Sequence, residues 1–337
     1  MDWPLLIAQL LLLSLSLLGV GAAHPTLLAQ ELFRLAISLL ATLAGLWLSL
    51  NTLLRSARWI WLLILGLLVL TLAIGEGPGG VHRWIAFRGL SFQPSELAKL
   101  GLILLLARGR TSWTDLLLSL SGVILVALEP DLGTAALLAS LLLLLLWANG
   151  TLSWKGFLSW TAGLASLILL LIARLPYAQA RLTKFWRGHV YQIVEAHRTL
   201  IQGGLLGHGW SGGMPPLPAS YTDMVFAAVV YGGGLLAGGL LLAAYGFLLY
   251  RTLRIALGLR GPYRLLILGL AAYLGLQASL NLIVVFGFFP VTGIPLPLVS
   301  YGGSSLTVSG LSLGLIQRAA LIQRTRFAWW SRGDSNP

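Results

Sequence analysis

The chain has 337 residues, of which 57% are hydrophobic and only 9% are charged. A soluble domain of this length could not bury so much apolar side chain in one core, so the composition excludes a soluble globular protein and predicts an integral membrane protein. The net charge of +12 would suggest a nucleic-acid partner for a soluble protein, but the basic residues sort by loop as in membrane proteins, and we expect no nucleic acid. The absence of cysteine excludes a disulfide and a thiolate metal site.

Apolar runs of about 18 to 25 residues recur along the chain, and a run of that length can cross a hydrocarbon layer of about 30 Å. They predict an all-α polytopic integral membrane protein with about ten transmembrane helices. The first run lacks the basic start and the cleavage site of a signal peptide, so we interpret it as a span. The predicted spans are 4–23, 31–51, 58–75, 95–108, 114–129, 132–149, 156–174, 223–250, 264–287 and 304–319, of which the fourth and fifth are short.

The charged residues sort by side in this arrangement. The basic residues of the loops fall on one side, which the positive-inside rule makes cytoplasmic, with both termini and the tail 320–337 inside. Six of the ten acidic residues fall in outside loops or at the outer ends of spans, namely Glu76, Glu96, Glu129, Asp131, Glu195 and Asp223. An outward-facing polar site would explain that distribution, and so would chance in a small sample.

Polar residues near the third to sixth spans are the first candidates for function. Arg83 and Trp84 lie in the outside loop after the third span, where Trp84 is typical of an interfacial aromatic residue. Glu96 and Lys99 are three residues apart on the fourth span and so share a helical face. Such a pair inside a membrane segment is either a structural salt bridge or part of a functional site. Asp131 lies in a tight turn and is well placed to cap the following helix.

The longest hydrophilic interruption, 175–222, is predicted to be a large extracytoplasmic loop. Within it, residues 183–202 have the pattern of one amphipathic helix lying in the membrane interface, with Ile193 and Ile201 on its apolar side. That helix is a lipid-surface anchor, or its cations, including Arg198, hold a lipid head group or a pyrophosphate. The glycine-rich stretch 203–213 allows close backbone approach to a ligand, or forms only turns.

The loop ends at Asp223, directly before a long apolar run, where an aspartate is either a helix N-cap or an acid–base group. A second unusual segment is 289–305, in which three prolines and three glycines exclude a regular helix. Its apolar residues, such as Ile294 and Leu298, do not suit a loop in water. We therefore predict a re-entrant segment at membrane depth, buried in protein or lining a wet cavity, with an apolar connector as the alternative.

Together these motifs resemble the signature of the SEDS family, the membrane proteins of shape, elongation, division and sporulation. The resemblance follows the family's order across most of the chain, through Arg83-Trp84-Ile85, Gln93-Pro94-Ser95-Glu96-Leu97-Ala98-Lys99, Glu129-Pro130-Asp131-Leu132-Gly133-Thr134, Tyr221-Thr222-Asp223 and Tyr301-Gly302-Gly303-Ser304-Ser305. Residues 294–300 resemble the RodA branch more than the FtsW branch. Two positions depart from the pattern: Tyr221 stands where members often have His, and Tyr231-Gly232 where many have an acidic pair.

The resemblance implies a peptidoglycan glycosyltransferase of the bacterial inner membrane that polymerises lipid II into β-1,4-linked glycan at the outer leaflet during cell elongation. It implies that Asp223 is the catalytic base of an inverting displacement, and that Glu96 and Lys99 line a central cavity. The other residues that it assigns to substrate binding or support are Arg83, Trp84, Asp131, Arg198, Ser300 and Tyr301. The departure at Tyr231-Gly232 puts in doubt a mechanism that needs a second acid on that helix.

The resemblance also implies a class B penicillin-binding protein as partner, besides lipid II and membrane lipids. No cofactor follows from the residues with certainty, and a divalent cation, Mg²⁺ or Mn²⁺, stays open. Two other functions fit the same features. A transporter that flips lipid II would also need an outward polar cavity, charges at membrane depth and a broken segment. A scaffold without catalysis would serve the penicillin-binding partner alone.

Overall fold

The computed structural model describes residues 1–77, 82–87, 90–174, 176–188, 190–210 and 213–331, so residues 332–337 of the predicted tail lie outside it. Within these residues the chain forms twelve α-helices, one short 3₁₀ helix and a two-stranded antiparallel hairpin. The elements are α1 (Trp3–Ala23), η1 (Pro25–Leu27), α2 (Leu28–Trp47), α3 (Leu50–Ile74), β1 (Ile85–Phe87), β2 (Leu90–Phe92), α4 (Pro94–Leu106), α5 (Trp113–Leu128), α6 (Leu132–Ala148), α7 (Trp154–Arg174), α8 (Pro176–Trp186), α9 (Tyr191–Gly203), α10 (Val225–Leu257), α11 (Gly261–Val285) and α12 (Gly303–Ser331).

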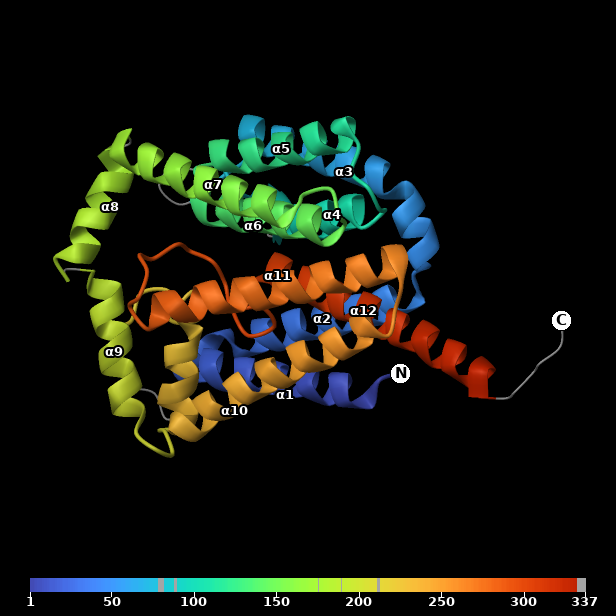
Figure 1. Cartoon of the computed structure of the whole chain (residues 1–337). Helices are drawn as coiled ribbons and strands as arrows, with labels where there is room; N and C mark the ends of the chain where they lie inside the picture. Colours follow the sequence, from blue (N-terminus) through green and yellow to red (C-terminus); the bar gives the residue numbers. More distant parts are fainter. Residues whose placement is uncertain (78–81, 88–89, 175, 189, 211–212, 332–337) are drawn as a thin grey trace, which may run out of the picture.

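The helices pack in two groups (Figure 1). Helices α3 to α7 form one group, and α1, α2, α10, α11 and α12 form the other, with α4 and α6 packed against α11 and α4 also against α12. The N-terminus and the end of α12 lie toward one end of the molecule, whereas α8 and α9 lie at the opposite end (Figure 1). We call these ends the terminal end and the loop end. The candidate site lies close to the junction between the two groups.

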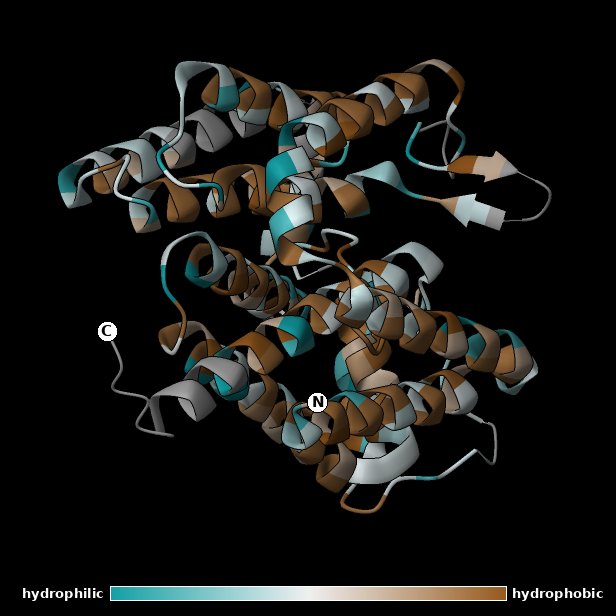
Figure 2. Cartoon of the chain, turned by 90° about the vertical axis from the view of Figure 1, so that its right-hand side faces the viewer, coloured by the Kyte–Doolittle hydropathy of each residue, from teal (hydrophilic) through white to brown (hydrophobic). Residues whose placement is uncertain are grey.

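Ten of the helices match the ten predicted spans. By length and composition alone, six helical segments of the described residues could each cross a membrane, and α5 and α6 are shorter apolar helices. At 1.5 Å per residue, the 13 residues of α4 and the 16 of α5 extend only about 20 to 24 Å, as expected for the two short runs. Most residues of the helices are hydrophobic (Figure 2), and large apolar side chains such as Trp3, Leu40 and Leu63 are exposed, as expected for a surface that faces lipid.

The boundary between the second and third spans was predicted wrongly. Helix α2 ends at Trp47, and α3 begins at Leu50, well before the predicted start at 58. The chain turns at Leu48, whose backbone is extended, and the side chain of Ser49 accepts a hydrogen bond from the Thr52 amide as an N-cap. Hydropathy does not register this cap, because the residues on both sides of it are apolar.

Helix α2 packs closely on α12 through small residues. The hydroxyls of Ser38 and Thr42 donate to the carbonyls of Leu306 and Gly310, at 2.9 and 3.0 Å. A Cβ atom added at Gly314 would lie only 2.2 Å from the Thr42 carbonyl oxygen, so only glycine fits there. Close approach of small residues with interhelical hydrogen bonds is a usual way to hold helices together in a membrane.

Helix α10 is kinked at Gly234, whose φ of 71° requires glycine. The kink frees backbone groups, and the glycine-rich stretch takes them up: the amides of His208 and Gly209 donate to the carbonyls of Tyr231 and Gly232, and the Leu235 amide donates to the Gly204 carbonyl. The glycines of 203–209 therefore let this stretch lie close to the backbone of α10. Close approach of the glycine-rich stretch to a ligand stays a prediction.

The amphipathic helix predicted for 183–202 is two helices. Helix α8 ends at Trp186 and α9 begins at Tyr191, with Gly188 between them at a φ of 66°. Ile193 is buried with Ala196 and Thr199 on the packed face of α9, whereas Ile201 is 80% exposed. The period of 3.6 runs across the break because the pattern of hydrophobicity does not reveal the glycine's conformation.

Candidate active site

The turn that carries Asp223 is held by its own backbone and by neighbours. The amides of Thr222 and Met224 both donate to the Ala219 carbonyl, at 3.1 and 3.0 Å. Helix α10 begins after Met224, which is its N-cap residue and makes no side-chain cap hydrogen bond. Asp223 thus precedes the cap position by one residue. Its side chain is half-buried, and its Oδ2 lies near Gly293 of the predicted re-entrant segment.

The segment between α11 and α12 is irregular and buried, as predicted. Ile294, Leu296, Leu298 and Val299 are each at most 3% exposed. Ser300 fastens this segment to the aspartate turn: its hydroxyl donates to the Thr222 carbonyl at 2.5 Å and accepts from the Leu296 amide at 2.7 Å. The sequence prediction of a folded-back segment buried in protein is therefore confirmed.

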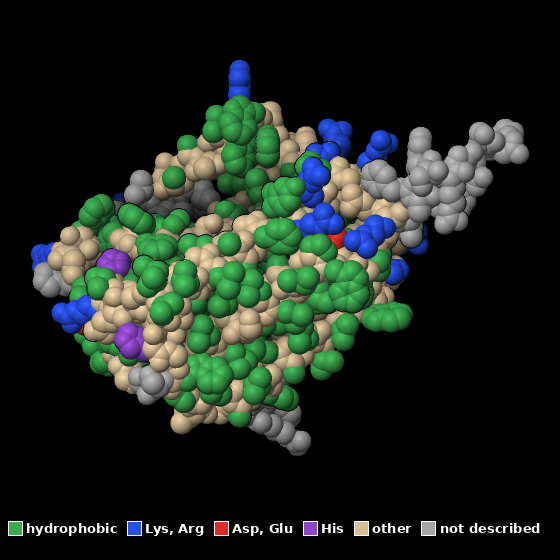
Figure 3. Space-filling view, turned by 90° about the horizontal axis from the view of Figure 1, so that it is seen from below, with side chains coloured by type: hydrophobic (Ala, Val, Ile, Leu, Met, Phe, Trp, Pro, Cys, Tyr) green, Lys and Arg blue, Asp and Glu red, His purple; other side chains and the backbone are tan. Residues whose placement is uncertain are grey.

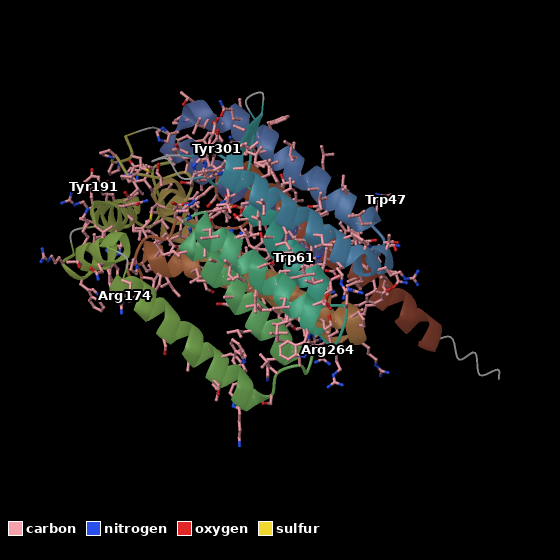
Figure 4. All side chains as sticks on the ribbon, turned by 90° about the horizontal axis from the view of Figure 1, so that it is seen from above. Trp47, Trp61, Arg174, Tyr191, Arg264 and Tyr301 are labelled. Atoms are coloured by element: carbon pink, nitrogen blue, oxygen red, sulfur yellow. The ribbon has the colours of Figure 1, made fainter. Side chains whose placement is uncertain are left out.

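Tyr301 makes a second connection between the same two segments. Its amide donates to the Tyr221 carbonyl at 2.8 Å, and the two rings meet edge to face at 5.3 Å. The Arg34 guanidinium of α2 stacks on the Tyr301 ring at 3.4 Å, and the Tyr301 hydroxyl donates to Gln30. Figure 4 places Tyr301 toward the loop end, with Tyr191 and Arg174, whereas Trp47 and Arg264 lie toward the terminal end.

Two polar side chains on α11 bond to the aspartate turn and to the re-entrant segment. Asn281 donates to the carbonyls of Asp223 and Ile294, at 2.7 and 2.8 Å. One turn further, Gln277 donates to the Pro295 carbonyl at 3.0 Å and accepts from Lys99 at 2.6 Å. Asn281 and Gln277 are each at most 1% exposed. They therefore link the aspartate turn and the re-entrant segment to Lys99 in the other helix group.

Glu96 and Lys99 form the ion pair that their spacing predicted. The Lys99 Nζ lies 2.6 Å from Glu96 Oε1, and both side chains are at most 2% exposed. Lys99 also lies 5.3 Å from the centre of the Tyr273 ring, so it is enclosed by side chains on several sides. This arrangement shows the structural salt bridge, and an electrostatic role toward a substrate stays a prediction.

The Asp131 turn lies at the loop end of α5 and α6. The Asp131 side chain accepts from the Thr134 amide at 3.1 Å, which confirms its predicted role as a helix cap. Its second oxygen accepts from Gln93 at 3.3 Å. The Arg83 guanidinium donates to the carbonyls of Glu129 and Pro130, so it holds the backbone of this turn.

The remaining predicted site residues lie on separate elements. Trp84 is half-buried and pairs its backbone with that of Glu76. Arg198 lies on α9, where its guanidinium contacts Glu195 at 2.7 Å and is 65% exposed. Ser300 and Tyr301 therefore contact the two residues before Asp223, and Asn281 contacts the Asp223 carbonyl and, through Gln277 on the same helix, leads to Lys99 and Glu96. The described side-chain contacts of Arg83, Asp131 and Arg198 are with other partners: the 129–130 turn, Thr134 and Gln93, and Glu195.

Sequence reasoning missed four residues of this region: Glu31 and Arg34 of α2, and Gln277 and Asn281 of α11. Glu31 is fully buried and accepts from the Ser16 hydroxyl, which lies 2.7 Å from both the Glu31 side chain and the Val299 carbonyl. The signal was present, because charges three residues apart, or amides four apart, inside an apolar run share one face.

Comparisons with known proteins agree with this architecture. A family model described as a cell cycle protein, which unites FtsW, RodA and SpoVE, matches residues 4–325. The chain belongs to this family, the SEDS family. The comparisons include both branches of the family: two curated relatives are named FtsW, and one solved neighbour is a RodA.

Two curated relatives are named probable peptidoglycan glycosyltransferase FtsW. The protein from Alkalilimnicola ehrlichii is 33% identical, covering 94% of this chain and 88% of its own length. The protein from Thiomicrospira cyclica is 32% identical over 81% of this chain and 78% of its own. Among solved structures, the rod shape determining protein RodA of Thermus thermophilus matches with a TM-score of 0.73 at 32% identity, covering 97% of both chains. A chain of a peptidoglycan synthase complex, solved for the coordination of polymerization and crosslinking, matches with a TM-score of 0.82 at 31% identity, covering 96% of this chain and 98% of its own.

Replacing Asn281 tests the support beneath the aspartate turn of this SEDS protein. In Asn281→Leu, the buried carbonyls of Asp223 and Ile294 lose their donor, which costs about 1–3 kcal/mol of stability and leaves the turn less well positioned. We expect a lower thermal unfolding midpoint and a reduced rate of glycan synthesis. The control is Asn149→Leu, since Asn149 likewise donates to two groups, Gly109 and Thr111, but at the terminal end. Equal rates in the two variants would contradict the positioning role.

Glu129 predicts a pH dependence of stability. It lies in the turn after α5, is fully buried and has no hydrogen-bond partner for its carboxyl oxygens among the described residues. Burial, with the nearby Asp131 charge, raises the pKa of Glu129 to about 8 from its ordinary 4.5. The folded state thus holds the proton more tightly, and its stability falls as the pH rises from about 4.5 to about 8.

Glu129→Gln removes this titrating group and keeps the side-chain shape. We expect the unfolding midpoint of the variant to exceed that of the wild type at pH 9, and the difference to shrink toward pH 5. A wild-type midpoint that falls no more steeply than the variant's over this range would show that Glu129 does not titrate as its burial implies.

Proposed function

We propose that this SEDS protein polymerises lipid II, a disaccharide-peptide carried on a polyprenyl pyrophosphate, into β-1,4-linked glycan. Its class as a peptidoglycan glycosyltransferase rests on family membership and on the curated relatives. The observation that carries the proposal is the aspartate turn at the loop end, in which Tyr301, Ser300 and Asn281 bond respectively to the backbone carbonyls of Tyr221, Thr222 and Asp223, while the Asp223 side chain stays half-exposed. An acid–base group held in place at the end of a membrane helix bundle is suited to a sugar whose lipid carrier lies in the membrane.

The proposed chemistry is one inverting displacement. The Asp223 carboxylate takes the proton from the acceptor sugar hydroxyl while that oxygen attacks the anomeric carbon. The new glycosidic bond forms, the bond to the pyrophosphate oxygen breaks, and the polyprenyl pyrophosphate leaves with the electron pair. Because an α-linked donor gives a β product in a single step, no covalent nucleophile is required. General-base assistance of this kind contributes typically about 10²–10⁴-fold to the rate.

Cations would stabilise the departing pyrophosphate. We propose Arg83, Arg198 and Lys99 for this role, with Trp84 and Asp131 supporting the loop end, and we add Arg34 because it stacks on Tyr301 beside the aspartate turn. Lys99 is enclosed by Glu96 and Gln277, so it would act through the local potential or after a rearrangement. In the described part of the chain, no three His, Asp or Glu side chains are grouped to hold a metal. A divalent cation would therefore be shared with the substrate's phosphates.

We place Asp223 at the outer leaflet of the bacterial inner membrane. Arginines and lysines gather toward the terminal end (Figure 3), which the positive-inside rule assigns to the cytoplasm. Residues 175–222 then form an extracytoplasmic loop of a single SEDS-type domain, with the tail inside. The RodA-like wording of residues 294–300 supports a role in elongation, and the synthase complex among the structural neighbours supports a class B penicillin-binding protein as partner.

The proposal is tested by incubating the purified protein with lipid II, with and without a penicillin-binding partner, and resolving the products by size. We expect glycan polymer with β linkages. Liposomes containing the protein and a labelled lipid II are assayed in parallel for transfer between leaflets. Translocation without polymer would indicate a transporter. If the protein by itself shows neither activity, and the partner by itself makes the polymer, the protein would be a scaffold.

A further inference from the structure

A cavity of about 550 Å³ opens at the terminal end, away from the candidate active site. Three arginines line it, each from a different part of the chain: Arg55 from the second turn of α3, Arg108 from the loop after α4, and Arg260 from the loop before α11. Asn51 and Tyr263 add neutral hydrogen-bonding side chains to the wall. The cavity thus presents three positive charges and several donors to one volume.

These arginines have no ion-pair partner among the residues that the structure describes. The acidic residues described at this end are already engaged: Asp115 contacts Arg58 at 2.9 Å, and Asp2 contacts Arg251 at 2.6 Å. No acidic side chain lines the cavity. Like charges converging without a counter-charge repel one another, so an anion bound between them would relieve that repulsion.

The backbone contributes in the same sense. Helix α11, of 25 residues, begins at Gly261 on the cavity wall, and its N-cap residue Arg260 makes no side-chain cap hydrogen bond. Pro262 has no N–H, but the other first-turn amides of this helix have no partner within it and carry partial positive charge, which favours a phosphate. This helix start therefore adds to a site that the three arginines already define.

The level of the cavity relative to the membrane indicates the source of the phosphate. Trp59 lies one turn from Arg55 on α3 and is 74% exposed, and Trp113 and Trp47 at the same end are 81% and 83% exposed. Exposed tryptophans mark the level of lipid head groups, and basic pockets between membrane helices at that level suit anionic lipids. We propose that this cavity binds the head-group phosphate of an anionic phospholipid from the leaflet at the terminal end.

The test is native mass spectrometry of the full-length protein in neutral detergent micelles with added phosphatidylglycerol or phosphatidylcholine. We expect the wild type to bind phosphatidylglycerol about tenfold more tightly than phosphatidylcholine. The triple variant Arg55→Gln/Arg108→Gln/Arg260→Gln should lose this preference. The matched control, Arg110→Gln/Lys155→Gln/Arg264→Gln, removes the same charge from the same end without touching the cavity, and should keep it.

Each other outcome overturns the assignment. Equal loss of preference in both triple variants would show attraction by the general charge of this end. Occupancy by inorganic phosphate or glycerol phosphate that competes with the lipid at equal concentration would assign the site to a soluble phosphate. The single variant Arg108→Gln, measured beside Arg110→Gln, decides the question if the triple variant does not fold, because only the cavity residue should weaken binding of phosphatidylglycerol.

Discussion

Replacing Asp223 with alanine is expected to abolish glycan synthesis while the protein stays folded. Asp223 lies one residue before Met224, the N-cap residue of α10, so its carboxylate does not occupy the cap position. The turn itself is held through backbone carbonyls, since the Ala219 carbonyl accepts from the Thr222 and Met224 amides and the Asp223 carbonyl accepts from the Asn281 side chain, and the substitution leaves these bonds in place. The expected loss of rate is about 10²–10⁴-fold, the usual contribution of a general base.

The measurement compares initial rates of polymer formation with thermal unfolding midpoints. Asp115→Ala is the control, because it removes an aspartate far from the candidate site, one that is buried and accepts from Arg58 at the terminal end. We expect that control to lose stability and to keep its rate. An Asp223→Ala protein that makes polymer as fast as the wild type would show that another group takes the proton.

Breaking the buried ion pair is expected to have the largest effect on stability. In Lys99→Met, Glu96 stays in the interior with its partner removed and with its second oxygen already lacking one. Removing one member of a buried pair typically costs about 3–5 kcal/mol. The double variant Glu96→Gln/Lys99→Met leaves no charge behind, and it should recover much of that loss.

The chain offers a matched comparison for this experiment. Arg198 and Glu195 have the same spacing and a contact of 2.7 Å, but Arg198 is 65% exposed. Arg198→Met should therefore cost no more than about 1 kcal/mol. Equal midpoints for Lys99→Met and Arg198→Met would contradict the role of burial, and a double variant less stable than Lys99→Met would contradict the role of the stranded charge.

The sequence predicted most of the helices because a membrane makes strong demands on composition. A segment such as α6 must be apolar throughout to cross hydrocarbon, so its bounds follow from hydropathy within a residue or so. The Glu96–Lys99 contact and the Asp131 cap were also predictable, since both depend on residues three apart in the sequence. Local spacing determines such contacts whatever the rest of the fold does.

The features that sequence missed depend on partners far apart in the chain. The kink at Gly234 exists because the backbone of 204–209 takes up the groups that it frees. Asn281 gains its role only when Asp223 and Ile294 are brought to it from two other segments. The break between α8 and α9 rests on the conformation of Gly188, which periodicity does not report.

The side of the membrane that carries the site can be measured with oriented proteoliposomes in which lipid II has been added to only one leaflet. We predict polymer when lipid II lies in the leaflet at the loop end, where Asp223 is, and none when the same liposomes carry Asp223→Ala. Polymer made only from lipid II at the terminal end, or made equally by Asp223→Ala, would contradict an outward-facing site built on this aspartate.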